Sequence, residues 1–114
     1  MKSRIQRVNQ LIKREISQIV LKEFDFPRNI LVTITRVETT ANLIESKIYV
    51  SVMPIEKFPE VFFELNKKIY GIQQELNKHL RMRPIPKIEF IEEKETKEAG
   101  RIEKILEEIK KEKY

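Results

Sequence analysis

The stretch Leu80-Arg81-Met82-Arg83-Pro84-Ile85-Pro86-Lys87-Ile88-Glu89-Phe90 decides how the two halves of this chain are joined. A helical apolar pattern runs into it, and an alternating apolar strand leaves it. Proline lacks an N–H group and disfavours helical geometry in the residue before it, so we expect the helix to end at about Arg83. Arg81 and Arg83 would then lie at a helix C-terminus, where the helix dipole favours cations and both side chains can reach a polyanion.

The composition indicates one small domain. The sequence has 114 residues and no cysteine. A domain of this size buries roughly two-thirds of the surface of its unfolded chain, and it needs neither disulfides nor a metal to fold. No apolar run approaches the ~18 residues that a membrane span requires, and no signal-peptide core follows Met1. We therefore expect a soluble, cytoplasmic chain that makes no membrane contact.

Positive charge is concentrated in the first four-fifths of the chain. Residues 1–91 hold 16 Lys and Arg against 10 Asp and Glu, whereas residues 92–114 hold 7 against 8. The basic residues gather in 1–22 and in 66–83. Two basic segments on one small domain indicate a polyanionic partner such as nucleic acid. A Lys- and Glu-rich surface of the kind found in heat-stable proteins is the alternative, and charge alone does not decide between them.

Hydrophobic spacing predicts helices and strands in a clear order. Ser3 and Gln6 form a capping box at the start of a helix that ends near Lys22. Gly71 interrupts the second helical pattern, and we interpret it as a kink or close junction between two helices. The predicted elements are a helix over 3–22, strands over 30–37 and 44–53, a helix from 59, a helix over 71–83, a strand around 88–90 and a helix from 96. In the second strand, one buried face is expected to hold Ile44, Ser46, Ile48, Val50 and Val52.

The predicted order is α-β-β-α-α-β followed by a C-terminal helix. A hairpin and a return through two helices would give a three-stranded sheet with helices on one face, which is an α+β fold. We expect residues 1–95 to form this domain and residues 96–114 to form a charged C-terminal helix or tail. The order is that of a type II KH domain.

Short motifs along nearly the whole chain carry a more specific resemblance. They are Arg4-Ile5-Gln6-Arg7-Val8, Ile12-Lys13-Arg14-Glu15-Ile16-Ser17, Val32-Thr33-Ile34-Thr35-Arg36-Val37-Glu38, Ala41-Asn42-Leu43, Lys47-Ile48-Tyr49-Val50-Ser51-Val52, the stretch 80–90, and Gly100-Arg101-Ile102. Each one alone could come from any amphipathic helix or β-branched strand. Together, in this order and at these spacings, they are specific. On these motifs the sequence resembles the bacterial ribosome-binding factor A family.

The resemblance implies a function and a fold. Members of this family are non-catalytic, bind the small ribosomal subunit late in its assembly, aid maturation of the 5′ end of its rRNA, and are linked to growth in the cold. Their KH-like fold has an Ala-x-Gly kink instead of a Gly-x-x-Gly loop. The kink position here reads Ile69-Tyr70-Gly71, so isoleucine replaces the small residue. The family's Asp-Pro-Arg turn reads Asp25-Phe26-Pro27-Arg28, with one residue inserted.

Two groups of residues are candidates for RNA binding. The first lies on the first helix, within an arc of roughly 80° that also contains Lys22. These side chains would follow a phosphate backbone, or else they only border the core by snorkelling. The second group flanks the expected kink, where a KH domain presents its nucleic-acid groove. The full set is Arg4, Arg7, Arg14, Arg28, Lys67, Lys68, Tyr70, Gly71, Lys78, Arg81 and Arg83.

Few aromatic or catalytic side chains are available. Core positions are expected for Phe62, Phe63 and Phe90. Tyr49 and Tyr70 are the candidates for base stacking. His79 is expected on the surface, and without cysteine it gives no typical transition-metal site. The sequence contains no nucleophile elbow and no glycine-rich phosphate loop, so we expect no enzyme, no cofactor and no metal.

We interpret the chain as a small-subunit assembly factor that holds immature rRNA through phosphate contacts and shape. Its expected partners are the rRNA of the small subunit, neighbouring ribosomal proteins and, as a further candidate, an assembly GTPase; the factor itself is expected to be a monomer. Two alternatives stay open. One is a protein–protein adaptor whose strand edge or C-terminal helix recruits a partner, with incidental RNA contact. The other is a general KH module for single-stranded nucleic acid, which the missing Gly-x-x-Gly disfavours.

Overall fold

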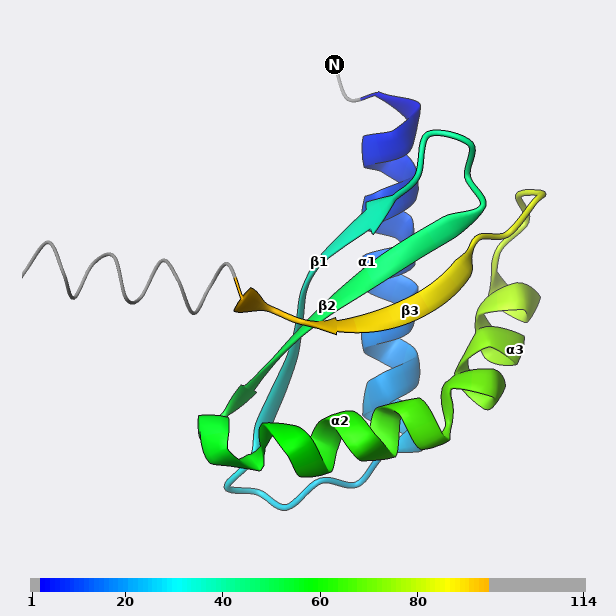
Figure 1. Ribbon diagram of the computed structural model, residues 1–114. Helices are drawn as coiled ribbons and strands as arrows, with labels where there is room; N and C mark the ends of the chain where they lie inside the picture. The colour runs from blue at the N-terminus through cyan, green and yellow to red at the C-terminus, as the bar shows by residue number, and fades with distance from the viewer. Residues whose placement is uncertain (1–2, 95–114) are drawn as a thin grey trace, which may run out of the picture.

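A computed structural model describes residues 3–94 of the chain, and within them the order of elements is the expected one (Figure 1). The elements are α1 (Arg4–Glu23), β1 (Leu31–Thr39), β2 (Glu45–Met53), a short 3-10 helix η1 (Ile55–Lys57), α2 (Phe58–Lys67), α3 (Ile69–His79) and β3 (Lys87–Glu92). The predicted α-β-β-α-α-β order is therefore confirmed. The predicted helix from residue 96 lies outside the described residues.

The described strands form one mixed sheet in the order β1-β2-β3. β1 and β2 are antiparallel, with Ile34 opposite Val50, and a bulge interrupts the register between Ile34 and Arg36. β3 runs parallel to β2, with Phe90 opposite Ile48. A parallel pair cannot be joined by a tight turn, so the chain crosses from β2 to β3 through α2 and α3.

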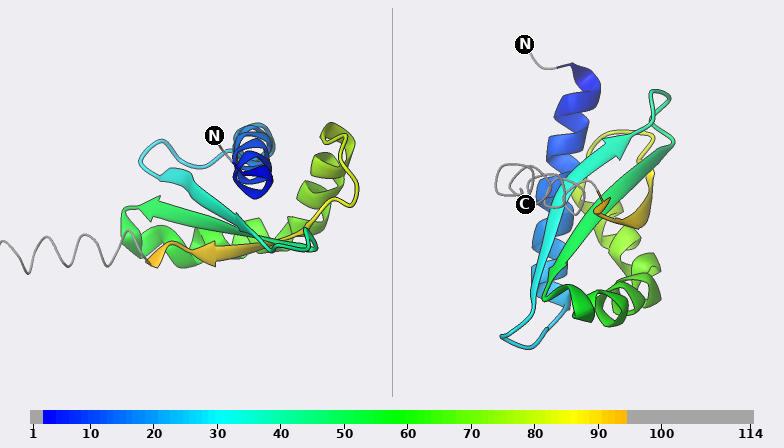
Figure 2. Two further views of the ribbon diagram at one scale, coloured as in Figure 1. Left: turned by 90° about the horizontal axis from the view of Figure 1, so that it is seen from above. Right: turned by 60° about the vertical axis from the view of Figure 1, so that its left-hand side comes forward.

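The core lies on the face of the sheet that the helices cover. Ile48, Val50 and Val52 of β2 are buried there together with Phe90 of β3, and they pack with buried residues of all three helices. Figure 2 shows α1 and α3 standing on this side of the sheet, while in Figure 1 α2 crosses the end of the sheet where β2 finishes. Lys47, one position along β2, is exposed on the opposite face. The expected one-sided α+β fold is confirmed.

The predicted first helix is confirmed together with its cap. Ser3 Oγ accepts a hydrogen bond from Gln6 N at 3.1 Å, and Gln6 Oε1 accepts one from Ser3 N at 2.9 Å. This reciprocal pair satisfies two N–H groups that a helix start otherwise leaves unpaired. The helix ends at Glu23, one residue beyond the predicted end.

The buried face of β2 differs from the prediction at its first residue. Ile44 is 58% exposed, and Leu43 is buried in its place. Leu43 has φ of 62°, a left-handed conformation that turns the chain by one residue before β2 begins. Thr40 Oγ1 accepts hydrogen bonds from Ile44 N at 3.2 Å and Glu45 N at 3.1 Å, which holds this turn. The conformation and hydrogen bonds of this turn therefore decide which side chain is buried, rather than the alternation of apolar and polar residues along the strand.

The predicted boundaries of the third helix are wrong at both ends. The break between α2 and α3 is at Lys68, with φ of −107° and ψ of 13°, and Gly71 lies inside the first turn of α3. A Cβ atom on Gly71 would meet nothing within 4 Å, so this glycine is not a close junction. Hydrogen bonds from Lys68 N back to α2 continue the helical path up to the break.

At its other end, α3 stops at His79 rather than near Arg83. Leu80 is extended, with ψ of 139°, and its side chain is buried. In a helix, the ring of Pro84 would clash with the carbonyl group of residue 80, so the helix must end before that carbonyl. Arg81 and Arg83 consequently lie in the connection over 80–86, not at a helix C-terminus.

One of the three phenylalanines expected in the core is not there. Phe63 is 65% exposed on α2, whereas Phe90 is 3% exposed. Phe62 is partly buried and stacks on Phe58, with ring centroids 4.9 Å apart. Consecutive residues on a helix point about 100° apart, so Phe62 and Phe63 cannot both face the sheet.

Contacts between polar side chains connect α1 to α3, which run antiparallel. Lys22 Nζ lies 3.4 Å from Glu75 Oε1, and His79 Nδ1 lies 3.5 Å from Glu15 Oε1. The hydrogen bond from Lys22 is the main cause that lowers the pKa of Glu75 below its ordinary value; the charge of Lys22 also contributes. Since the folded-state pKa is lowered, the stabilisation is present at neutral pH and is lost as the pH falls through that pKa.

Removing the amine at position 22 should move the titration of Glu75. In Lys22→Met we expect the Glu75 pKa to rise toward the ordinary value of a glutamate, because its main hydrogen-bond donor is gone. Side-chain carboxyl NMR shifts followed over an acid titration would measure this. Lys57→Met is the matched control, because Lys57 pairs with Glu60 and not with Glu75. An unchanged Glu75 titration in Lys22→Met would contradict the predicted contact.

Candidate nucleic-acid interface

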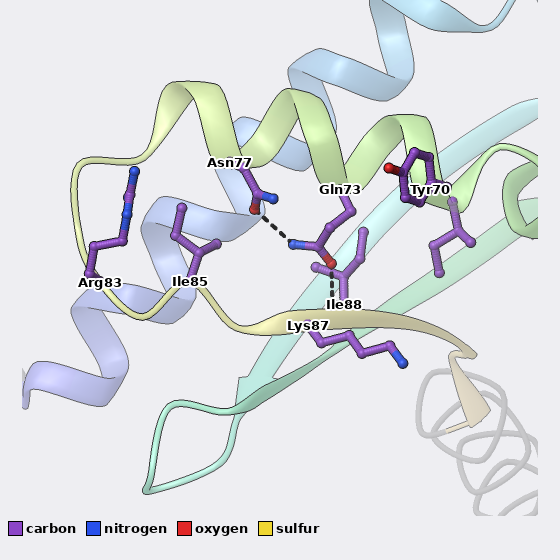
Figure 3. A pocket seen from close by; sticks show the side chains of 8 residues that line it. Tyr70, Gln73, Asn77, Arg83, Ile85, Lys87 and Ile88 are labelled. Atoms are coloured by element: carbon purple, nitrogen blue, oxygen red, sulfur yellow. Dashed lines mark hydrogen bonds between the residues drawn. The ribbon is translucent and has the colours of Figure 1, made fainter.

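An open groove of about 590 Å³ runs between α3 and the start of β3 (Figure 3). Its lining comes from α3, from the 80–86 connection and from β3. The lining residues are Ile69, Tyr70, Gln73, Asn77, Arg83, Ile85, Lys87 and Ile88. The groove therefore lies where α3 faces the outer edge of the sheet, and the position of α3 sets its width.

Gln73 ties α3 to the edge of β3 across the floor of this groove. Its Nε2 donates to Pro86 O and to Asn77 Oδ1, both at 3.1 Å, and its Oε1 accepts from Ile88 N at 2.9 Å. The side chain thus occupies the hydrogen-bonding positions that a neighbouring strand would otherwise fill. Figure 3 shows the Gln73–Asn77 bond and the bond toward β3 between the two walls.

The two ends of the groove have different chemistry. Tyr70 is 76% exposed, in the first turn of α3. Arg83 stands at the other end, and its Nη1 donates to Met82 O at 2.7 Å. Lys87 adds a second cation at the start of β3. No carboxylate is among the described residues that line the groove.

This arrangement suits unpaired nucleotides. An exposed tyrosine ring can stack on a base, cations can contact phosphates, and the apolar side chains of Ile69, Ile85 and Ile88 can contact base or sugar edges. Within residues 3–94, no group of three or more His, Cys, Asp or Glu residues is placed so that it could hold a metal ion. In the same residues, no helix is both long and apolar enough to cross a membrane.

The structure brings only some of the predicted RNA-binding residues together. Of that set, Tyr70 and Arg83 line the groove, and Gly71 follows Tyr70 on α3. Lys78 is exposed at the far end of α3, where it pairs with Glu75 at 3.7 Å. Arg81 is exposed in the connection beside Arg83.

The other predicted residues divide between the two ends of the molecule. Arg4 and Arg7 are exposed on the first turns of α1, at the same end as the 80–86 connection (Figure 1). Arg28, in the loop between α1 and β1, and Lys67, the last residue of α2, are exposed, and these two segments lie toward the opposite end of the molecule in Figure 1. The predicted residues therefore do not form one continuous surface.

Two further predicted residues have partners within the fold. Arg14, midway along α1, pairs with Glu15 at 3.6 Å. The Nζ of Lys68, at the break between α2 and α3, lies 5.0 Å from the centre of the Phe24 ring. Both side chains are nevertheless exposed.

Tyr49, the other tyrosine predicted to stack on bases, has one ring face covered. The guanidinium carbon of Arg36 lies 3.7 Å from the centre of its ring. The Tyr49 hydroxyl donates to Glu38 Oε1 at 2.9 Å. Burial is the largest cause that raises the pKa of Tyr49, followed by this hydrogen bond. Tyr70 is therefore the better stacking candidate.

Sequence reasoning missed Gln73, Asn77 and Lys87. The two amides are spaced by four residues, so they share one face of α3. Lys87 immediately precedes the alternating strand. These signals were present, but they identify a groove only once β3 is known to lie beside that face of α3.

Comparisons with known proteins find relatives over most of the chain. The profile of the family described as ribosome-binding factor A matches residues 4–106. Ribosome-binding factor A of Thermodesulfovibrio yellowstonii is 33% identical over 108 residues, which cover 95% of this chain and 92% of that protein.

Two related structures, a crystal structure and a homology model fitted into a cryo-EM map, share the fold. The crystal structure of ribosome-binding factor A from Thermus thermophilus aligns with a TM-score of 0.66 and 19% identity, over 77% of this chain and 93% of that chain. Coordinates of the Thermus thermophilus factor fitted into the cryo-EM map of a 30S complex align with a TM-score of 0.62 and 21% identity, over 80% of this chain and 93% of that chain.

Replacing Gln73 should destabilise the fold. Gln73→Leu leaves Ile88 N–H and Pro86 C=O without their side-chain partner, so we expect a loss of about 1–3 kcal/mol in the free energy of unfolding. Urea unfolding followed by circular dichroism would measure it. Gln74→Leu makes the same change at an exposed position of α3 and should cost far less. Equal losses in the two variants would argue against the role of Gln73 as a tie.

Replacing Tyr70 should weaken RNA binding without unfolding the protein. We expect Tyr70→Ala to lose about 1–3 kcal/mol of affinity for a labelled single-stranded RNA of about ten nucleotides, since stacking of one base contributes that much. Fluorescence anisotropy would measure the affinity. Phe63→Ala, which removes an exposed ring from α2, is the matched control. Similar affinities for both variants would place base stacking elsewhere.

Proposed function

Since this chain belongs to the ribosome-binding factor A family, we propose that it binds the small ribosomal subunit through that subunit's rRNA. Family membership rests on the profile match over residues 4–106 and on the 33% identity to a relative along nearly its whole length. A related Thermus thermophilus factor has been fitted into the map of a 30S complex, which supports the same partner for this chain.

The observation that carries the proposal is the groove between α3 and β3. It combines an exposed tyrosine, two cations and apolar side chains, without a carboxylate among its described lining residues. RNA sequence is read mainly on unpaired bases, whereas paired regions are recognised by shape and backbone. We therefore assign one short unpaired rRNA segment to the groove and assign paired rRNA to the end of the molecule where Arg4 and Arg7 lie with the 80–86 connection.

The factor would act by binding rather than by chemistry. A protein that binds one rRNA arrangement more tightly than another shifts the population toward the first by the difference in affinity. Such a shift is enough to favour late maturation of the subunit and access to the 5′ end of its rRNA. Action by binding is supported by the family resemblance, which implies that family members are non-catalytic assembly factors.

Several finer properties belong to the same proposal. We expect the protein to act as a monomer in the cytoplasm, beside neighbouring ribosomal proteins and with an assembly GTPase as a further partner. A role in growth in the cold is expected only from the resemblance to the family. The general KH alternative has less support, because no Gly-x-x-Gly loop joins α2 to α3.

Co-sedimentation with purified small subunits over a salt series tests the proposal. We expect wild-type binding to weaken steeply with salt, because phosphate contacts release counterions. Arg83→Glu with Lys87→Glu should bind more weakly, and loss of the two phosphate contacts should reduce the slope of log K against log salt by about 1.4.

The matched control makes the same change in net charge, but at two lysines that lie away from the groove. Lys47→Glu with Lys57→Glu alters the open sheet face and η1, neither of which lines the groove. Its salt dependence should stay close to that of the wild type. Absence of wild-type binding at low salt would overturn the proposed function, whereas equal effects of the two double variants would move the RNA contact away from the groove.

A further inference from the structure

The outer edge of β1 has no pairing strand in the described part of the chain. β1 pairs with β2 on one side only, because it stands first in the sheet order. Alternate residues of such an edge direct their N–H and C=O groups outward. Within residues 3–94, no backbone hydrogen bond outside the β1–β2 ladder reaches Leu31, Val32 or Thr33. An edge of this kind is a template for another strand.

An apolar groove of about 600 Å³ lies beside this edge, between the last turns of α1 and the first half of β1. Its walls include Val20, Phe24 and Ile34. Leu21 is 81% exposed and Leu31 is 61% exposed along its sides. Exposed leucines flanking an open strand edge are typical of a surface that binds a partner.

The surroundings of this groove are acidic. A second hollow of about 420 Å³ shares Phe24, Asp25, Phe26 and Ile30 with it. The carboxylates of Glu23, Asp25, Glu60 and Glu64 line that hollow, against the single amine of Lys68. The lining is therefore mainly acidic, while Lys57, which pairs with Glu60 at 3.5 Å, and the exposed Arg28 and Lys67 lie outside it. Such a surface repels nucleic acid and attracts a basic partner.

We propose that this surface binds an extended, basic segment of a partner protein, which adds to β1 as a fourth strand. Main-chain hydrogen bonds to β1 provide the pairing, and alternate apolar side chains of the segment occupy the groove. Lysine or arginine side chains of the segment face the carboxylates at the end of the groove. This edge is opposite the α3–β3 groove, so the inference does not depend on RNA binding there.

A synthetic peptide of alternating lysine and valine, acetylated and amidated at its ends, is the probe. Isothermal titration calorimetry measures its affinity, and NMR locates it on the full chain. We expect shifts and slowed amide exchange on β1 and in the residues beside it, and none in the α3–β3 groove. The same peptide with glutamate for lysine, or with proline for its central valine, should bind at least about tenfold more weakly.

Variants of the surface test the two attractions separately. Leu21→Ser with Leu31→Ser removes exposed apolar contacts, and Glu60→Gln with Glu64→Gln removes charge. Each pair of substitutions should weaken binding of the lysine–valine peptide by about tenfold. The fold should be retained, because three of these side chains are exposed and Glu64 is partly exposed. Ile44→Ser is the matched control, since Ile44 is 58% exposed but lies outside the groove.

Several results would overturn the inference. They are no binding of the lysine–valine peptide, equal binding of the glutamate peptide, or shifts confined to the α3–β3 groove. Shifts of β1 amides caused by single-stranded RNA would assign the edge to nucleic acid instead. Shifts of β1 amides that depend on protein concentration alone would assign it to a second copy of the chain. Loss of small-subunit binding would leave the inference intact, because the peptide assay does not use the subunit.

Discussion

The side chain of Gln73 connects α3 to the outer edge of β3 through hydrogen bonds, and it lines the groove between these two elements. It bonds Ile88 N and Pro86 O in place of a further strand, so β3 keeps its edge satisfied without being covered by backbone. An apolar side chain at this position would favour closer packing of α3 and would leave polar groups unpaired. α3 is held from its other side by α1, through the contacts of Lys22 with Glu75 and of His79 with Glu15.

The element order was predictable because periodicity and turn residues agree along the chain. The capping box of α1, the β-branched strands and the two prolines before β3 each indicate one structure only. The ends of α3 were not predictable to the residue. A proline acts on the carbonyl four positions before it as well as on the preceding residue, so the helix stops at His79 rather than near Arg83. Leu43 similarly replaces Ile44 in the core through a turn that alternation cannot represent.

The site was less predictable than the fold. A helical wheel places side chains around one helix, but it does not place two helices relative to each other. Tyr70 and Arg83 line one groove, whereas the loop that holds Arg28 and the end of α2 that holds Lys67 lie away from the start of α1 that holds Arg4. Gln73 was missed because its role depends on β3, which is distant in sequence. Composition indicated a polyanionic partner, yet it could not show that Glu23, Asp25, Glu60 and Glu64 line one hollow.

The two edges of the sheet differ in charge, and this difference has a geometric consequence. Neighbouring strands lie about 4.8 Å apart, so β1 and β3 are separated by roughly 10 Å. Arg83 and Lys87 line the groove beside β3, although Glu45 and Glu89 line a neighbouring hollow at that edge, whereas carboxylates of α2 and of the α1–β1 connection predominate in the hollow next to the β1 edge. A polyanion approaching the molecule is directed toward the β3 edge, and a basic chain toward the β1 edge. These two linings would orient the protein at a place where RNA lies next to a basic protein. This orientation would arise before any specific contact forms.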